Sequence, residues 1–219
     1  MNVHSGWGFR LSIFLAVLGA VGFLIVTLIV RADLLRQLDF NITVKLQHHM
    51  PRRLDTVGIW LGTLAQFQII VPFLIGMLCL FRRWLIVVSS LVLLLGSHLL
   101  EIVGKALLFQ PPPPFMFYRH PTEFLFPDSH TFNESSYPSG HSMRVTFMAM
   151  TLGLLVWQQQ KLPTWLKLGL LLILVGFTFI TILTRITLGE HWMSDVIGGA
   201  FLGLFIGSIN WALMSQDTT

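Results

Sequence analysis

The sequence predicts an all-α polytopic membrane protein, with six transmembrane helices and a short interfacial helix after the first. Of its 219 residues, 54% are hydrophobic and 11% are charged, and the mean hydropathy is +0.73. Soluble domains carry about 25% charged residues, so this composition excludes an ordinary soluble enzyme. A spanning helix needs about 20 apolar residues. Six stretches near that length leave no room for a separate soluble domain, so we expect residues 1–219 to form one domain.

The net charge of +4 and the pI near 9.7 come from 14 Lys and Arg residues scattered along the chain. Because they form no basic run, we expect no nucleic-acid partner. Charges of this kind suit lipid headgroups or an anionic substrate. The single cysteine, Cys79, excludes an intrachain disulfide and a cysteine-based metal cage.

Six apolar stretches are predicted to span the membrane. They run near 11–30, 57–80, 85–108, 139–157, 165–184 and 193–213. The first is longer than the apolar core of a signal peptide, and no small-residue cleavage site follows it. We therefore interpret it as a retained anchor.

The connection after the first stretch predicts a short helix at the membrane surface. In LLRQLDFNITVKLQHHMPRRLD, apolar residues recur at helical spacing with Arg, Asp and Lys between them. The apolar positions are Leu34, Leu35, Leu38, Ile42 and Leu46. This amphipathic pattern is typical of a helix that lies in the plane of the interface.

The longest connection, from Phe109 to Tyr137, covers about thirty residues rich in Pro, Phe and His. Long connections without regular structure are usually functional or disordered, and the aromatic content favours a lid or rim over a site. A packed surface loop is the alternative. His120 and His130 lie here, but no short-spaced partner supports a zinc site, so we interpret them as ordinary interfacial side chains.

Positive charges do not assign an orientation. A six-span order places both termini on one side, which holds Arg10, Arg82, Arg83, Lys161 and Lys167. The first connection alone places five on the other side, namely Arg31, Arg36, Lys45, Arg52 and Arg53. Taken literally, the positive-inside rule leans toward a cytoplasmic first connection.

Polar groups gather at a membrane boundary where the fourth stretch begins. The segment reads Tyr137-Pro138-Ser139-Gly140-His141-Ser142-Met143-Arg144. A helix N-terminus offers unpaired N–H groups and the positive end of a dipole, and both favour an anion. There Ser139 supplies a hydroxyl, Gly140 lets the backbone approach a phosphate oxygen, and His141 can transfer a proton.

A second such segment, RITLGEHWMSD from Arg185 to Asp195, joins the fifth and sixth stretches. If a helix begins near Gly189, His191 and Asp195 lie four apart and share a face. The carboxylate can then hold one ring nitrogen and raise the basicity of the other. Arg185 offers a planar fork suited to phosphate oxygens. A six-span order brings both segments to the same side of the membrane, where they can converge.

These segments resemble the type-2 phosphatidic acid phosphatase superfamily, to which vanadium haloperoxidases are related. The family pattern is K-x6-R-P, then P-S-G-H, then R-x5-H-x3-D. The second part is complete at 138–141, and the third is complete as Arg185, His191 and Asp195. The combination is highly specific, whereas P-S-G-H alone would be a weak signal. The six-span layout extends the resemblance across most of the chain.

The resemblance implies a role for each matching residue. His191 would attack phosphorus and form a phosphohistidine, with Asp195 orienting it, and His141 would protonate the leaving group. The phosphate would be held by Ser139, Gly140, Arg185 and Lys105. The family needs no metal or other cofactor, so metal ligation by His191 and Asp195 is the less favoured alternative.

The first part of the pattern departs from the family. Lys105 fits its lysine, but Pro112 stands seven residues later where the arginine should be. Arg119, in the same loop, and Arg144, on the face of His141, are hypothetical substitutes. Arg144 has a structural alternative, which is an ion pair with Glu101. That residue shares one face of the third stretch with two further polar residues, His98 and Lys105.

We therefore expect a metal-independent phosphatase that acts on a membrane lipid phosphate or pyrophosphate. Undecaprenyl pyrophosphate is favoured because small six-span bacterial relatives use it. Phosphatidylglycerol phosphate, phosphatidic acid and lipid A phosphates are alternatives, as are a lipid phosphotransferase and an inactive relative that binds headgroups. The resemblance places the protein in the bacterial cytoplasmic membrane with its site on the extracytoplasmic face. Headgroup, chain length and oligomeric state stay open.

Overall fold

The computed structural model describes residues 3–80, 84–119 and 135–216, and all regular structure within these ranges is helical. The helices are α1 (Val3–Arg31), α2 (Arg36–His49), η1 (Arg52–Leu54), α3 (Asp55–Leu64), α4 (Phe67–Leu80), α5 (Trp84–Leu107), η2 (Phe115–Phe117), α6 (Gly140–Gln158), α7 (Thr164–Thr187) and α8 (Met193–Gln216). The predicted all-α class is confirmed.

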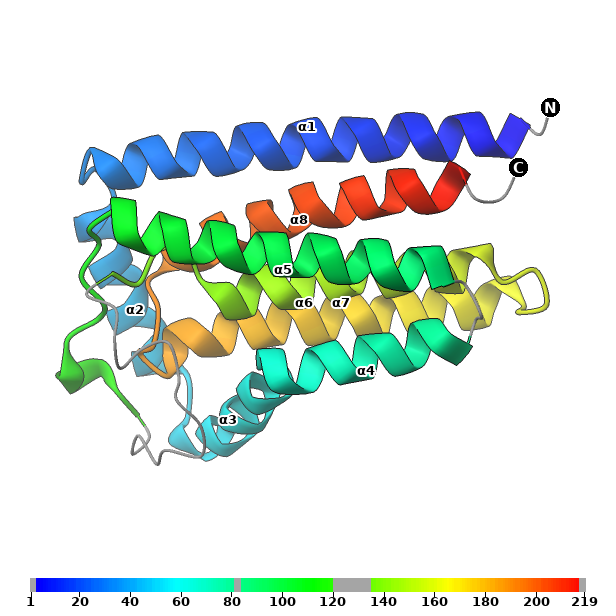
Figure 1. Ribbon diagram of the computed structural model, residues 1–219. Helices are drawn as coiled ribbons and strands as arrows, with labels where there is room; N and C mark the ends of the chain where they lie inside the picture. The colour runs from blue at the N-terminus through cyan, green and yellow to red at the C-terminus, as the bar shows by residue number, and fades with distance from the viewer. Residues whose placement is uncertain (1–2, 81–83, 120–134, 217–219) are drawn as a thin grey trace.

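The long helices lie side by side in one bundle, and α2 lies across one end of it (Figure 1). At this α2 end, α1, α5 and α7 finish and α6 and α8 begin, so both motif segments and Lys105 meet there. The two chain termini lie at the opposite end. The helix expected after the first span is thus present as α2.

Four helices, α1, α5, α7 and α8, are long and apolar enough to cross a membrane, and the bent pair of α3 and α4 makes a fifth candidate span. The chain is therefore an integral membrane protein. The expected six-span count is not confirmed, because α6 is not among the candidates. This helix carries His141 and Arg144 in its first turns, which lowers its apolar content, although it runs within the bundle (Figure 1).

The second expected span, 57–80, is broken near Ala65, and its two halves meet at an angle of 60°. A bend of this size frees backbone groups that need partners inside a membrane. The Ala65 carbonyl accepts a hydrogen bond from Nε of Arg144 at 3.1 Å. A buried arginine from α6 therefore stabilises the break.

Three glycines of α8, spaced four residues apart, face α6 and allow the two backbones to approach closely. A Cβ on Gly199 or Gly203 would collide with the carbonyl of Ser139 or Met143, and one on Gly207 would press on Met150. Small residues at this spacing favour tight helix packing in membranes. The stripe fixes the start of α8 against the start of α6, where the two motif segments lie.

Candidate active site

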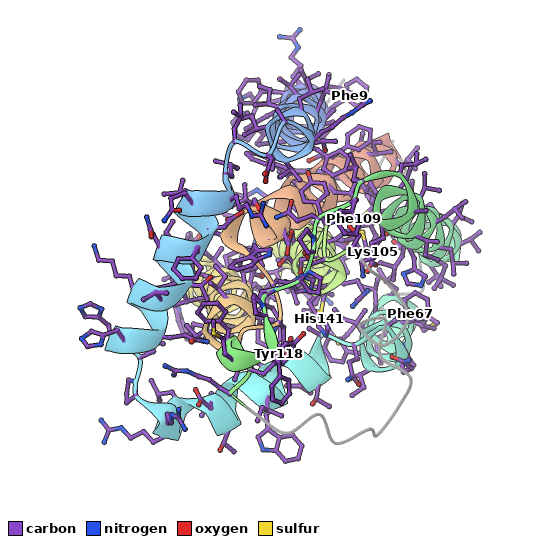
Figure 2. The ribbon with its side chains drawn as sticks, turned by 90° about the vertical axis from the view of Figure 1, so that its left-hand side faces the viewer. Phe9, Phe67, Lys105, Phe109, Tyr118 and His141 are labelled. Atoms are coloured by element: carbon purple, nitrogen blue, oxygen red, sulfur yellow. The ribbon has the colours of Figure 1, made fainter. Side chains whose placement is uncertain are left out.

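The starts of α6 and α8 are joined directly. The Ser139 N–H donates to the carbonyl of Asp195 at 3.0 Å. Ser139 is the N-cap of α6, and its Oγ accepts from the N–H of Ser142 at 3.4 Å. Two helix N-termini therefore converge at the α2 end, and their dipoles favour an anion there. Figure 2 looks onto this end, with His141 and Lys105 inside the ring of helices.

The expected contact between His191 and Asp195 is present, but α8 begins at Met193 and not near Gly189, so His191 lies in the turn before the helix. Nδ1 of His191 lies 3.3 Å from Oδ2 of Asp195, and that oxygen also accepts the Trp192 N–H at 2.9 Å. Both side chains are fully buried. Because the carboxylate engages Nδ1, the ring is oriented so that Nε2 is the nitrogen suited to nucleophilic attack.

Tyr137 anchors the chain just before the P-S-G-H segment. Its hydroxyl lies 2.8 Å from Oγ1 of Thr27, its ring stacks on Phe23, and a Cβ on Gly198 would collide with that ring. Burial raises the pKa of Tyr137 to about 12. The phenol is therefore a neutral clamp that joins α1 and α8 at the start of α6.

Arg185, in the last turn of α7, is buried between that helix and α3. Nη1 donates to Glu190 at 2.5 Å, and Nη2 donates to the Gly58 carbonyl at 2.5 Å. A Cβ on Gly62 would collide with the guanidinium, so a glycine one turn along α3 opens the space that Arg185 fills. Nε is buried, with no hydrogen-bond partner among the described residues.

Lys105 and Arg144 share one buried carboxylate, that of Glu101. Oε1 accepts from Lys105 at 2.9 Å, while Oε2 accepts from Arg144 at 3.3 Å and lies 3.1 Å from His98. A Cβ on Gly140 would collide with the same carboxylate. The ion pair predicted as the structural alternative for Arg144 is thus present, and it links this arginine to Lys105 beside the start of α6.

Arg119 contacts a different part of the molecule. Its guanidinium donates to the carbonyls of Met50 and Gln47 and lies 3.3 Å from Oδ1 of Asp55. These partners lie in the last turn of α2, just after it, and at the start of α3, so the side chain of Arg119 bridges the two helices. His120 and His130 lie outside the described residues.

The turn between α7 and α8 is fixed by Gly189, whose φ is +77°. The N–H groups of Glu190 and His191 both donate to the Arg185 carbonyl, at 3.0 and 3.2 Å. A Cβ on Gly189 would also collide with the carbonyl of Phe117. Glycine is therefore required twice at this position, for its left-handed backbone and for the approach of η2.

Asp39 of α2 reaches the start of α8 and was not singled out by sequence reasoning. Oδ1 accepts the Ser194 N–H at 2.9 Å, and Oδ2 accepts the Ser194 hydroxyl at 2.6 Å. Gln110 donates to the same hydroxyl at 2.9 Å. Burial raises the pKa of Asp39, with the nearby Asp195 carboxylate adding to the shift, and the bonds from Ser194 act against it.

A sequence model of the PAP2 superfamily matches residues 83–218, more than half of the chain. The chain belongs to the PAP2 superfamily. No curated protein matches it significantly in sequence.

Two solved structures share the fold. A PAP2-type phosphatidylglycerolphosphate phosphatase from Bacillus subtilis superposes with a TM-score of 0.76 at 22% identity, covering 92% of this chain and 96% of that chain. LpxE from Aquifex aeolicus superposes with a TM-score of 0.59 at 20% identity, covering 79% of this chain and 94% of that chain. This chain therefore has the fold of membrane PAP2 proteins across most of its length.

Sequence reasoning missed four residues that shape the site, which are Asp39, Gly58, Gly62 and Glu190. Glu190 lies inside the R-x5-H-x3-D segment, and a search for carboxylates beside the motif arginine would have found it. The two glycines have the four-residue spacing typical of close helix approach. No local signal identifies Asp39, because its partner Ser194 is 155 residues away.

Proposed function

We propose that this PAP2 protein is a membrane-embedded phosphatase that hydrolyses a lipid phosphate or pyrophosphate through a phosphohistidine on His191. The observation that carries the proposal is the buried Arg185 Nε donor, unpartnered among the described residues, at the end of the bundle that holds the His191–Asp195 pair. An unsatisfied buried donor is costly. A phosphate oxygen would satisfy it.

The reaction has two steps. Nε2 of His191 attacks phosphorus, the bond from phosphorus to the lipid-side oxygen breaks, and His141 donates a proton to that oxygen. Water then attacks phosphorus while His141 takes a proton from it, the P–N bond breaks, and inorganic phosphate leaves. Asp195 stabilises the positive charge on His191 in both steps. We also propose that neither step requires a metal ion.

The phosphate-holding groups would be Ser139, Gly140, Arg185 and Lys105. The two cations each face a carboxylate, Glu190 for Arg185 and Glu101 for Lys105. These contacts compensate the buried positive charge. The N-terminus of α6 adds the positive end of a helix dipole, which favours the phosphate. Arg144 contributes through Glu101, by fixing the carboxylate that Lys105 contacts.

The substrate would be a lipid because the site lies at one end of a bundle with long apolar helices. Undecaprenyl pyrophosphate is the first candidate, by resemblance to small six-span bacterial relatives. Phosphatidylglycerol phosphate is the second, supported by the fold shared with the Bacillus subtilis phosphatase at a TM-score of 0.76. We place the enzyme in a bacterial cytoplasmic membrane with its site on the extracytoplasmic face.

The test is phosphate release by purified protein in detergent with excess chelator. Undecaprenyl pyrophosphate, phosphatidylglycerol phosphate and phosphatidic acid are offered in parallel, and His191→Ala is the inactive control. We expect release that survives chelation and disappears in the variant. Acid-labile radiolabel retained by wild type, but not by His191→Ala, would identify the phosphohistidine.

Two other outcomes would redirect the proposal. Label that passes to an added lipid acceptor instead of water would identify a phosphotransferase. If folded protein releases no phosphate from any lipid and retains no label, the enzyme proposal fails, and Pro112 in place of the first-motif arginine would explain an inactive, headgroup-binding relative.

A further inference from the structure

A pocket of about 580 Å³ opens at the α2 end, between the end of α1, helix α2 and the proline segment after α5. Its walls are Val30, Arg31, Asp33, Leu35, Arg36, Asp39, Phe40, Phe109, Gln110, Pro111, Pro112, Pro114 and Trp192. The volume lies in the range of small-molecule sites. Apolar rings and four charged residues together make it suited to an amphiphilic headgroup.

The pocket borders the proposed nucleophile. Trp192 follows His191 in the chain, and its Nε1 donates to the Pro111 carbonyl at 2.7 Å. Asp39, on another wall, holds Ser194. The α7–α8 turn therefore forms one side of the pocket. A molecule bound there would lie next to the turn that carries His191.

The other side of the pocket continues into the exposed apolar surface of α1. Helix α1 packs chiefly on α8, and only 11% of its spanning window is buried. Large apolar side chains on α1, among them Leu24 and Leu28, are exposed on the way to Val30 in the pocket wall. Hydrocarbon chains of a lipid can therefore lie along α1 while its headgroup enters the pocket.

The pocket offers two cationic groups. Arg31 is exposed and has no ion pair recorded among the described residues. Arg36 pairs with Asp33 at 3.6 Å, but both side chains are at least 70% exposed, and such a pair stabilises by less than about 1 kcal/mol. Both oxygens of Asp39 accept from Ser194. An anion can therefore engage Arg31 and draw Arg36 away from its weak partner.

Backbone strain marks the same rim. Asp33 has φ +54°, and within the described residues no other non-glycine residue has a positive φ. Glycine would be favoured at this helix end. Strained residues of this kind cluster at ligand sites, which favours a ligand site at this rim.

We propose that this pocket binds a second phosphate group of the lipid substrate, the one between the phosphate that is cleaved and the hydrocarbon chains. The inference rests on the proposed lipid phosphatase function and narrows its substrate class. The phosphodiester of phosphatidylglycerol phosphate and the inner phosphate of a lipid pyrophosphate share this chemistry, and phosphatidic acid lacks it. Guanidinium groups of Arg31 and Arg36 would hold the phosphate through charge-assisted hydrogen bonds.

The first experiment compares kcat/KM for phosphatidylglycerol phosphate, undecaprenyl pyrophosphate and phosphatidic acid. The variants are Arg31→Gln and Arg36→Gln. The matched control is Arg10→Gln, an exposed arginine on α1 at the opposite end of the bundle. In the pocket variants we expect the preference for a two-phosphate substrate over phosphatidic acid to fall about tenfold, as for the loss of a hydrogen bond to a charged group. Arg10→Gln should keep the preference.

The pattern of loss separates the two sources of the second phosphate. A fall confined to phosphatidylglycerol phosphate assigns the pocket to a phosphodiester, and a fall confined to undecaprenyl pyrophosphate assigns it to a pyrophosphate. An unchanged preference in both pocket variants, or an equal loss on all three lipids, would overturn the proposal.

A binding measurement separates this inference from the proposed function. His191→Ala protein is mixed with phosphatidylglycerol, which keeps the phosphodiester but lacks the terminal phosphate, and bound lipid is counted by native mass spectrometry. Adding Arg31→Gln should weaken binding about tenfold, and adding Arg10→Gln should not. If wild type hydrolyses nothing, the proposed function fails and this measurement alone decides the pocket. Equal binding by both double variants would reject the pocket whatever the activity.

Discussion

Two helices, α1 and α7, end in the same backbone turn with different residues at the turning point. In each, the chain bonds back to the last helical turn in a Schellman motif, with one residue in the left-handed region. That residue is Gly189 after α7, with φ +77°, and Asp33 after α1, with φ +54°. Only the first is the glycine that this geometry favours.

The surroundings explain the difference. The carbonyl of Phe117 leaves no room for a Cβ at Gly189, whereas Asp33 is exposed on the rim of a pocket. Each turn also carries an ion pair. The Arg185–Glu190 pair is buried at 2.5 Å, and the Arg36–Asp33 pair is exposed at 3.6 Å. One turn is closed and holds the proposed nucleophile. The other is open and, in our proposal, exchanges its partner for a ligand.

Breaking the two ion pairs should give the largest difference between the two turns, measured as loss of unfolding free energy. Glu190→Gln leaves Arg185 buried without a charged partner, so we expect a loss of about 3 kcal/mol in the free energy of unfolding. Arg36→Gln breaks an exposed pair and should cost less than about 0.5 kcal/mol. Chemical denaturation in detergent measures both. Equal losses would show that the two turns do not differ in burial as described.

Substituting the turning glycine should act on activity more than on stability. In Gly189→Ala a left-handed alanine costs about 1 kcal/mol, and the Cβ must push Phe117 or the turn itself away. A displacement of His191 by up to about 1 Å should lower kcat about 100-fold. The control is Gly169→Ala in α7, where a Cβ meets nothing within 4 Å. A fully active Gly189→Ala enzyme would contradict the closed turn.

Local patterns predicted one contact beside the closed turn and none beside the open one. The i, i+4 spacing of His191 and Asp195 predicted their contact, and the motif placed Arg185 nearby. The pocket beside the open turn is bordered by Asp39, which meets Ser194, a residue 155 positions away. No periodicity in the sequence encodes such a contact, so the pocket could be found only in three dimensions.

The helix positions show the same limit. Apolar stretches predicted where the long helices run, because burial in a membrane depends on local composition. The break near Ala65 was missed, since it has neither proline nor glycine at the bend and is stabilised by Arg144 from another helix. The predicted number of six spans was also not confirmed. The reason is that α6 carries polar residues of the candidate site and does not pass as a candidate span.

Asp39 links α2 to the start of α8, and the titration of its carboxyl group should give a smaller effect that tests this link. Burial raises its pKa above 3.8, so folding favours the protonated form. Stability from this group is therefore present at low pH and lost as pH rises from about 4 through the raised pKa. Measuring the thermal unfolding of wild type and Asp39→Asn across pH 4–7 isolates the contribution of this carboxyl group to stability. The wild-type advantage over the variant should shrink as pH rises, and an advantage that grows would mean that the Ser194 bonds outweigh burial.

The smallest expected effect is a gain in stability, from a substitution at Asp33. Asp33→Gly removes the strain of an L-residue at a left-handed position, and its own ion pair contributes little because it is exposed. We expect a gain of about 0.5 kcal/mol in the free energy of unfolding. Asp33→Asn, which tolerates the same conformation and also breaks the pair, is the control and should change stability by less. A loss in Asp33→Gly together with no change in Asp33→Asn would mean that glycine's greater freedom in the unfolded chain outweighs the relieved strain. The open turn would then owe its aspartate to folding and not to the pocket.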